Sequence, residues 1–361
     1  MCVSPIRIRN PNKGKSYIGL NFLKDCESDF INVPCGVCCQ CIALNQMYLV
    51  QRVQMEAIYN DIYFSTLTYD NEHLPSLLTS QGYSISFADL RDVQLMIKRI
   101  RDKDLFGEPF RYLCVSEFGS ERGRPHFHIL WLFKKRDTGL MEHYAFANRL
   151  YDVVFSQWSR NIGTNRKPIY EPLFTYHSKY RSGKFFSNFD LHYVVPSLTS
   201  SGCSDVAFYV LKYMLKGNSK VSKLHDALKL NYDAEEFSKY WSLIRPKLSY
   251  SPFFGYDAFY GANRTYDYNS DIVSYLRSCV SKTPREIGFP NFYSPDSGKS
   301  FPLCPFYRSN SDIYSVSDAI EFYDKSPDLR PDKDISIYIR QIDNFVETCK
   351  ITDLHSFDDQ F

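Results

Sequence analysis

Long apolar runs are the first thing that this 361-residue sequence lacks. The longest strongly apolar run, from Phe127 to Phe133, is far too short to span a bilayer, so no membrane partner is expected. The opening residues MCVSPIRIRN contain arginines and no continuous apolar stretch, which argues against a secretory signal and predicts a cytoplasmic protein. There is no G-x-x-x-x-G-K-[ST] loop, so no nucleotide cofactor is expected. Internal repeats and long low-complexity segments are also absent.

The 11 cysteines are an odd number, which argues against a disulfide framework. Four of them lie close together, at positions 35, 38, 39 and 41. Tetrahedral zinc prefers four thiolate or imidazole ligands, usually from two separated pairs. One interpretation is a structural zinc ion with Cys35, Cys38 and Cys41 as ligands, completed by Cys26 or Cys2. The other is a group of thiols that bind no metal.

The small net charge of +2 conceals an uneven distribution. Residues 312–361 hold 12 acidic and 5 basic side chains, a net charge of −7, so the rest of the chain carries +9. A basic body with an acidic tail is typical of a protein that binds a polyanion. A tail that only solubilises the protein explains the pattern equally well.

The periodicity of apolar residues predicts strands separated by helices. In the segment 87–105, for example, Leu90, Val93, Ile97 and Ile100 fall on one helical face. Beyond residue 223 few clear periods can be recognised. The order of elements favours an α+β fold in which helices cover a sheet. Strands are predicted at 61–70, 109–119, 125–133 and near 190–195, and helices at about 42–59, 87–105, 142–160 and 205–216.

His126 and His128 lie two residues apart on a predicted strand, so both imidazoles point to one face and Phe127 points to the other. Glu117 ends the preceding strand, and a hairpin turn through Gly123 would bring its carboxylate beside them. Two imidazoles and a carboxylate leave coordination positions open and suit Mg²⁺ or Mn²⁺ holding a phosphate oxygen. The alternative is a surface pair of histidines and a salt bridge from Glu117 to a neighbouring arginine.

Tyr209 and Tyr213 are four residues apart on a predicted helix and share one face. Lys212 and Lys216 form a second pair with the same spacing. A free phenol has a pKa near 10, but a nearby metal ion and ammonium groups would favour the phenolate as a nucleophile. A helix whose tyrosines pack on the sheet while its lysines are solvated is the alternative.

In this order, the motifs resemble those of the HUH endonuclease superfamily, most closely the rolling-circle replication initiators of the Microviridae and, among these, the gokushovirus type. The resemblance covers about the first 220 residues. It rests on the MC start, VPCGVCCQC (33–41), FSTLTYD (64–70), SEFGSERGRPHFHIL (116–130) and YVLKYMLK (209–216).

The resemblance implies a ferredoxin-like or RRM-like antiparallel sheet with the His-x-His strand at its centre, plus N- and C-terminal extensions. It implies Glu117, His126 and His128 as metal ligands, with Tyr209 and Tyr213 as nucleophiles. The implied reaction nicks viral DNA at its origin through a 5′-phosphotyrosine link and later rejoins the ends. Host helicase and polymerase would be partners, in the cytoplasm of an infected bacterium.

Residues 165–186 interleave basic and aromatic side chains, which predicts either a single-stranded-DNA contact or a surface loop. The candidate contacts are Arg166, Lys167, Lys179, Arg181, Lys184, Tyr170, Phe174, Tyr176 and Tyr180. Three parts are expected: a cysteine-bearing segment at 1–58, a catalytic domain at 59–222 and an extension at 223–361. The competing functions are an HUH transposase or mobilisation enzyme, a non-catalytic single-stranded nucleic-acid-binding protein, and a structural virion component.

Overall fold

The computed structural model divides the chain into two compact units, which are described separately. The first comprises Met1–Met55, Ser197–Phe208 and Gly255–Phe361, and the second Glu56–Pro196 and Tyr209–Phe254. The three parts expected from the sequence stay a prediction about independently folding segments. The structure describes residues 5–10, 13, 29–35, 39–119, 123–174, 180–181, 184–185, 190–194, 207, 210–211, 219–252, 254–255, 291–294, 299–302 and 304.

The first unit joins segments from both ends of the sequence. Strand β1 (Ile6–Arg9) pairs antiparallel with β2 (Phe30–Val33), and β14 (Asn291–Ser294) pairs antiparallel with β15 (Lys299–Pro302). Helix α1 (Cys39–Tyr59) begins in this unit. Within it, the buried side chain of Gln51 accepts a hydrogen bond of 2.8 Å from the backbone N–H of Cys304. A residue more than 250 positions further along the chain is therefore fixed to the helix.

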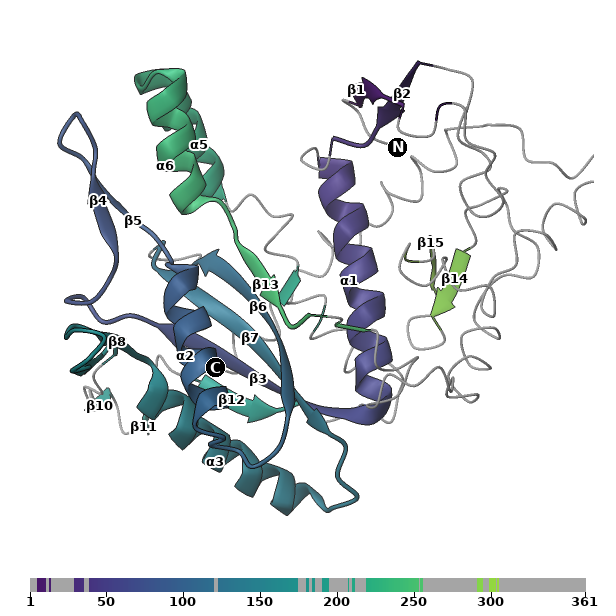
Figure 1. The fold of residues 1–361 in the computed structure, drawn as a ribbon, viewed down its shortest axis with the longest axis vertical. Coiled ribbons are helices and arrows are strands. Elements are labelled where there is room, and N and C mark those ends of the chain that lie inside the picture. Colours follow the sequence, from purple (N-terminus) through teal and green to yellow (C-terminus); the bar gives the residue numbers. More distant parts are fainter. Residues whose placement is uncertain are drawn as a thin grey trace, which may run out of the picture. The chain divides into compact units, whose positions relative to one another are not determined.

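The second unit is built on a five-stranded antiparallel sheet in the order β12-β3-β7-β6-β13. Helix α2 (Leu90–Asp102) connects β3 to β6, and α3 (Leu140–Gln157) connects β7 to β12. Each helix thus joins two strands that are separated in the sheet by one other strand (Figure 1). This is the ferredoxin-like arrangement, and the predicted fold class is confirmed. The strands are β3 (Asn60–Thr68), β6 (Phe110–Phe118), β7 (Pro125–Lys134), β12 (Asp190–Tyr193) and β13 (Leu248–Tyr250).

The alternation of side chains along the central strand β7 decides which face carries the histidines. Phe127, Ile129, Trp131 and Phe133 belong to the hydrophobic core formed with α2 and α3. His126 and His128 therefore lie on the opposite face. That face is also buried beyond them, since Leu130 and Leu132 are at most 1% exposed. A strand with apolar side chains on both faces reads as a continuous hydrophobic run, which accounts for the apolar stretch in the sequence.

Asp92 on α2 ties the end of β3 to the sheet's helical layer. Its side chain is 4% exposed and accepts a hydrogen bond of 2.9 Å from the hydroxyl of Tyr69, which follows β3 directly. The guanidinium of Arg160 on β8 (Ser159–Asn161) donates to both carboxylate oxygens of Asp92, at 3.1 and 2.6 Å. Three elements that are distant in sequence are thus held at one buried carboxylate.

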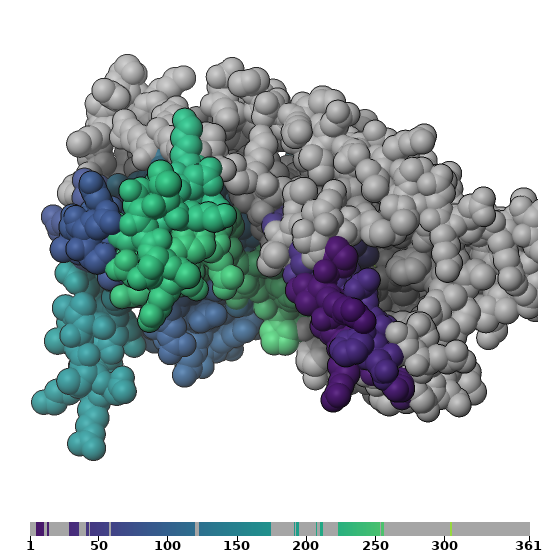
Figure 2. All heavy atoms as spheres, turned by 90° about the horizontal axis from the view of Figure 1, so that it is seen from above, coloured from purple at the N-terminus to yellow at the C-terminus, as the bar shows by residue number. Residues whose placement is uncertain are grey.

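Helices α5 (Ser219–Asn231) and α6 (Ala234–Ile244) pack on the hairpin of β4 (Ser76–Leu78) and β5 (Ser84–Ser86). Phe118, the residue after Glu117, lies in the shared cluster with Ile85, Leu228 and Tyr240. In Figure 2 the two helices (green) lie against the hairpin (blue). The sequence did not predict α5, α6 or β13. This module begins one residue from the candidate metal ligands.

A second hairpin, formed by β8 and β9 (Tyr170–Pro172), projects from the unit as the teal segment of Figure 2. Its turn requires glycine at position 163, because a Cβ there would lie 2.4 Å from the carbonyl oxygen of Lys167. The residues on this turn are largely exposed, among them Ile162 and Ile169 at 60% each. The short pair β10 (Tyr180–Arg181) and β11 (Lys184–Phe185) follows it in the chain.

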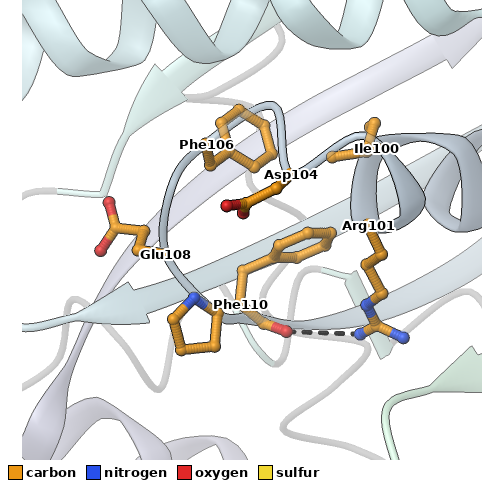
Figure 3. A pocket seen from close by; sticks show the side chains of 7 residues that line it. Ile100, Arg101, Asp104, Phe106, Glu108 and Phe110 are labelled. Carbon is orange, nitrogen blue, oxygen red and sulfur yellow. Dashed lines mark hydrogen bonds between the residues drawn. The ribbon is translucent and has the colours of Figure 1, made fainter.

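A cavity of about 310 Å³ lies at the turn between α2 and β6 (Figure 3). Arg101 crosses it and donates to the carbonyl oxygen of Phe110 at 3.3 Å. Phe110 and Glu117 are at opposite ends of β6, about 23 Å apart at the rise of an extended strand. The cavity is therefore separate from the histidines. It is lined by Ile100, Arg101, Asp104, Phe106, Glu108, Pro109 and Phe110.

Among the helices that the structure describes, none combines the length and the apolar character that crossing a membrane requires.

Candidate metal centre

Strand register places Glu117 beside the two histidines. In the antiparallel ladders Glu117 pairs with His126, and Thr66 and Val115 pair with His128. The turn between β6 and β7 is closed by a hydrogen bond of 3.0 Å from the N–H of Gly119 to the carbonyl oxygen of Arg124. Gly123 in this turn has φ +64°, a left-handed conformation that favours glycine. The predicted hairpin is thus present, with the three side chains on one face.

Three ligand atoms converge at this point of the sheet. Nε2 of His128 lies 2.7 Å from Oε2 of Glu117, and Nε2 of His126 lies 3.3 Å from the same oxygen. The two Nε2 atoms are 3.2 Å apart. Among the residues that the structure describes, Glu117, His126 and His128 are the group of His, Cys, Asp or Glu side chains that could hold a metal ion.

The other nitrogen of each imidazole is held from behind. Nδ1 of His126 lies 3.0 Å from the carbonyl oxygen of Arg124, and Nδ1 of His128 lies 3.1 Å from the hydroxyl of Thr66. The ring of Phe64 stacks on His128 with centroids 5.3 Å apart. Histidines that bind metals are usually fixed in this way through their second nitrogen. Both Nε2 atoms are therefore directed at the carboxylate of Glu117.

The dimensions of the triangle fit a divalent ion. Ligand atoms in adjacent positions of an octahedron, each about 2.1 Å from the ion, lie about 3.0 Å from one another. The observed separations are 2.7, 3.2 and 3.3 Å. Three ligands on one side leave the other positions for water or substrate oxygen. The side chain of His126 is the most exposed of the three, at 14%, so the open side is next to it.

Electrostatics keep the carboxylate ready to act as an anionic ligand. Burial alone would raise the pKa of Glu117, but hydrogen bonds from His126 and His128 outweigh it and hold the pKa of that carboxyl below its usual range. Arg124 does not pair with Glu117. It donates instead to the carbonyl oxygen of Tyr69 and, at 2.7 Å, to Oδ1 of Asn71.

The predicted nucleophiles Tyr209 and Tyr213, with Lys212 and Lys216, lie outside the described residues. Of the helix predicted at 205–216, the structure describes Ala207, Val210 and Leu211, which are helical and buried. Tyr69 is a described tyrosine close to the end of β3, but it does not suit the role. Its buried hydroxyl donates to Asp92, and burial together with that carboxylate raises its pKa.

The predicted zinc ligands cannot be assembled from the described residues. Cys35 is partly exposed and Cys41 is buried, whereas Cys26 and Cys38 lie outside the described part of the chain. A structural zinc ion stays a prediction.

The predicted DNA-contacting segment is described in part. Arg166 and Lys167 are exposed on the β8–β9 turn. Tyr170 is 45% exposed, and Arg99 and Lys103 of α2 lie 5.0 and 5.9 Å from its ring centre. Phe174 packs against the core, so it is not available for stacking on bases. Lys179 and Tyr176 lie outside the described residues, as do the side chains of Tyr180, Arg181 and Lys184.

A further histidine, His73, joins the loop after β3 to β9. Its Nδ1 lies 2.6 Å from Asp70, and its Nε2 lies 3.4 Å from Glu171. Burial alone would lower the pKa of His73, but hydrogen bonds to both carboxylates outweigh it and raise that pKa above its usual value. A raised pKa in the folded state means that the protonated form stabilises the fold.

We expect the His73→Gln variant to lose up to about 1 kcal/mol of stability at about pH 5.5 and almost none at about pH 8.5. The contribution is fully present below the unfolded-state pKa and is lost as the pH rises through the folded-state pKa. Melting temperatures of wild type and variant at both pH values measure this. An equal difference at the two values would contradict the assignment.

Sequence comparison agrees with the class of protein that the fold and the site indicate. Residues 62–186 match the model of a family of replication-associated proteins, the ORF2 type. This segment runs from β3 through β11 and contains all three candidate metal ligands. The resemblance to phage replication proteins that the motifs indicated is thereby confirmed.

Individual relatives give the same result. The chain is 29% identical to the replication-associated protein VP4 of Bdellovibrio phage phiMH2K over 140 residues, which is 37% of this chain and 41% of the relative. It is 28% identical over 125 residues to the replication-associated protein ORF4 of Chlamydia phage 1, covering 34% of this chain and 30% of the relative. With the replication-associated protein ORF2 of Spiroplasma virus 4 it shares 27% identity over 139 residues, covering 36% and 43%.

The matched part thus spans less than half the length of each of these relatives. No solved structure matches the chain significantly.

Proposed function

We propose that this protein is a replication initiator that nicks viral DNA at its origin and rejoins the ends by tyrosine transesterification. The observation that carries the proposal is the convergence of Glu117, His126 and His128, in which both histidines are fixed through Nδ1. A site built in this way is suited to hold Mg²⁺ or Mn²⁺. The similarity to replication-associated proteins of bacterial viruses supports a role in replication.

The proposed reaction exchanges one phosphate ester for another. The phenol oxygen of Tyr209 or Tyr213 forms a bond to the scissile phosphorus, and its proton passes to solvent. The bond from phosphorus to the 3′-oxygen breaks, and that oxygen takes up a proton to leave a free 3′-hydroxyl. A bound divalent ion would supply Lewis-acid stabilisation of the phosphate's negative charge. Lys212 and Lys216 would favour the phenolate and neutralise the phosphate.

Two tyrosines allow the strand to be passed from one to the other. The second tyrosine cuts the regenerated origin after one round, and the released 3′-hydroxyl attacks the first phosphotyrosine to close a circle. Because the covalent link conserves the energy of the ester, no nucleotide cofactor is required. Host polymerase would extend the 3′-hydroxyl and host helicase would unwind the duplex, in the cytoplasm of the infected bacterium.

The β8–β9 hairpin is the proposed contact for the DNA strand. Arg166 and Lys167 can approach phosphates, and Tyr170 offers an exposed ring on which a base can stack. Arg99 and Lys103, which lie beside that ring, add positive charge from α2. The hairpin begins near the end of β3, because the N–H of Asp70 donates to the carbonyl oxygen of Leu173 at 3.0 Å.

The test is to incubate the protein with Mn²⁺ and end-labelled single-stranded DNA carrying candidate origins, followed by denaturing electrophoresis. Wild type is expected to give a protein-linked 5′ end that requires the metal. The His126→Ala variant and the Tyr209→Phe/Tyr213→Phe double variant are expected to give no covalent product, a loss of at least about 10³-fold. The two single tyrosine variants show whether one tyrosine can replace the other.

Tyr144→Phe is the matched control, since Tyr144 is an exposed tyrosine on α3 that belongs to neither site. It should cleave like wild type. DNA binding that is equally strong with and without metal, and that yields no covalent product on any origin, would refute the nuclease. That result would favour a non-catalytic protein that binds single strands. Covalent cleavage confined to transposon-end or transfer-origin sequences would favour a transposase or mobilisation enzyme.

A further inference from the structure

The two histidines differ in what holds their Nδ1 atoms, and this difference assigns a role to Thr66. We propose that Thr66 is a positioning residue whose hydroxyl lets His128 change tautomer when a metal ion binds. The inference rests on the proposed metal site but not on the proposed nuclease reaction. Thr66 lies on β3 and pairs directly with His128 across the ladder, so its hydroxyl and the imidazole share one face of the sheet.

His126 has one tautomer available to it. Its Nδ1 lies 3.0 Å from the carbonyl oxygen of Arg124, which can only accept a hydrogen bond. Nδ1 of His126 therefore carries the hydrogen, and its Nε2 has a free lone pair. This is the form that a metal ligand requires, and metal binding changes nothing at His126.

His128 is in the opposite state while no metal is bound. Its Nε2 lies 2.7 Å from Oε2 of Glu117 and 3.2 Å from Nε2 of His126. Both of these atoms are acceptors when Glu117 is ionised and His126 has the tautomer just described. Nε2 of His128 must then carry the hydrogen and donate it. Its Nδ1 is left as an acceptor and takes the hydrogen of the Thr66 hydroxyl at 3.1 Å.

Metal binding requires the other tautomer, since Nε2 must give up its hydrogen to offer a lone pair. The hydrogen on Nε2 goes to solvent, and Nδ1 takes one from solvent, so that the imidazole stays neutral. Nδ1–H then needs an acceptor in a site where the side chain is 5% exposed. A hydroxyl can rotate from donor to acceptor without moving its oxygen. A backbone carbonyl could satisfy only the second state, and an apolar side chain neither.

The packing around His128 favours exchange of hydrogens over movement of the ring. Phe64 stacks on the imidazole at an interplanar angle of 25°, and Phe64 and Thr66 lie on the same face of β3. The ring is thus held between an aromatic face and the carboxylate of Glu117. Thr66 lets the ring keep this position in both states.

The first test is the tautomer itself, measured by long-range ¹H–¹⁵N correlation spectra of histidine-labelled full-length protein at about pH 8, where a free imidazole is neutral. The His128 signals are identified by their loss in His128→Gln. Wild type should show Nε2–H in EDTA and Nδ1–H with saturating Mg²⁺, whereas His126 should show Nδ1–H in both. The same tautomer of His128 under both conditions would overturn the proposal.

The second test is the affinity for Mn²⁺ in the absence of DNA, measured by calorimetry. Thr66→Val, which keeps the shape of the side chain but removes the hydroxyl, should weaken binding by about 10- to 100-fold. Thr66→Ser should restore binding to within about threefold of wild type, because the hydroxyl is retained. Ser65→Ala is the control. It removes a neighbouring buried hydroxyl, which accepts from Trp131 at 2.8 Å, and should not change affinity.

The outcomes separate this role from the proposed function. Tight binding by wild type with unchanged binding by Thr66→Val would overturn only the role of Thr66. Equal losses in Thr66→Val and Thr66→Ser would do the same, since the hydroxyl would then be irrelevant. No binding by wild type would overturn the metal site and with it the proposed reaction.

Discussion

Replacing Glu117 by glutamine is expected to lower the affinity for Mn²⁺ by at least about 100-fold while the sheet stays folded. Glu117 is the single anionic group of the triad, and its ionised form is favoured by the pair of histidines. Glutamine has almost the same shape and can still accept a hydrogen bond from His128. The fold should therefore lose little, whereas the ion loses the ligand that neutralises part of its charge.

Glu108→Gln is the matched control for this experiment. Glu108 precedes β6 at the end remote from Glu117 and pairs with Arg136. Its substitution should leave Mn²⁺ binding unchanged. Calorimetric titrations of wild type with Mn²⁺ and with Mg²⁺ should also show tighter binding of Mn²⁺, because two of the three ligands are imidazoles. Binding by Glu117→Gln within threefold of wild type, at about the error of such titrations, would rule out the triad as the metal site.

The Asp92→Ala variant is expected to lose about 3 kcal/mol of unfolding free energy, the largest effect on stability that we predict. The substitution leaves the buried hydroxyl of Tyr69 without its acceptor and removes both hydrogen bonds from Arg160. Because Arg160 is partly exposed, its guanidinium can turn to water, which keeps the loss below that of a fully buried pair. The melting temperature should fall by roughly 6–12 °C.

The loss at Asp92 is expected to reach the metal site. Tyr69 provides the carbonyl oxygen that binds Arg124, and the carbonyl oxygen of Arg124 in turn holds His126. Weaker Mn²⁺ binding should therefore accompany the lower stability. Asp102→Ala, an exposed acidic residue on the same helix, should change stability by less than about 0.5 kcal/mol. Equal melting temperatures for Asp92→Ala and wild type would show that the buried carboxylate does not join these elements.

The central hairpin could be predicted from the sequence because its signals are local. Alternation of apolar residues along 125–133 defines a strand, and Gly123 marks the turn. The distance between Glu117 and His126 then follows from a short loop. The contribution of Thr66 could not be predicted, since it depends on the register between β3 and β7, two strands separated by α2 and β6. The carbonyl oxygen of Arg124 has no sequence signature at all.

The helices beyond residue 223 had a signal that was overlooked. Asp233 is followed three residues later by Glu236, which is typical of a helix start, and the Asp233 side chain accepts from the N–H of Glu236 at 2.8 Å. Strand β13 is different. It has three residues, and its identity as a strand comes from pairing with β6, more than 130 positions earlier. No local pattern predicts such an element.

This late strand has a consequence for how the sheet resists association with other chains. Without it, β6 would be an edge strand, with a row of unpaired N–H and C=O groups beside the candidate metal ligand. Leu248, Ser249 and Tyr250 cover that row opposite Val115, Cys114 and Leu113. An uncovered strand of this length is a template for pairing with a neighbour, and covering it with a very short strand leaves little for that neighbour to extend. The segment after α6 thus guards the sheet against aggregation at the strand that carries Glu117.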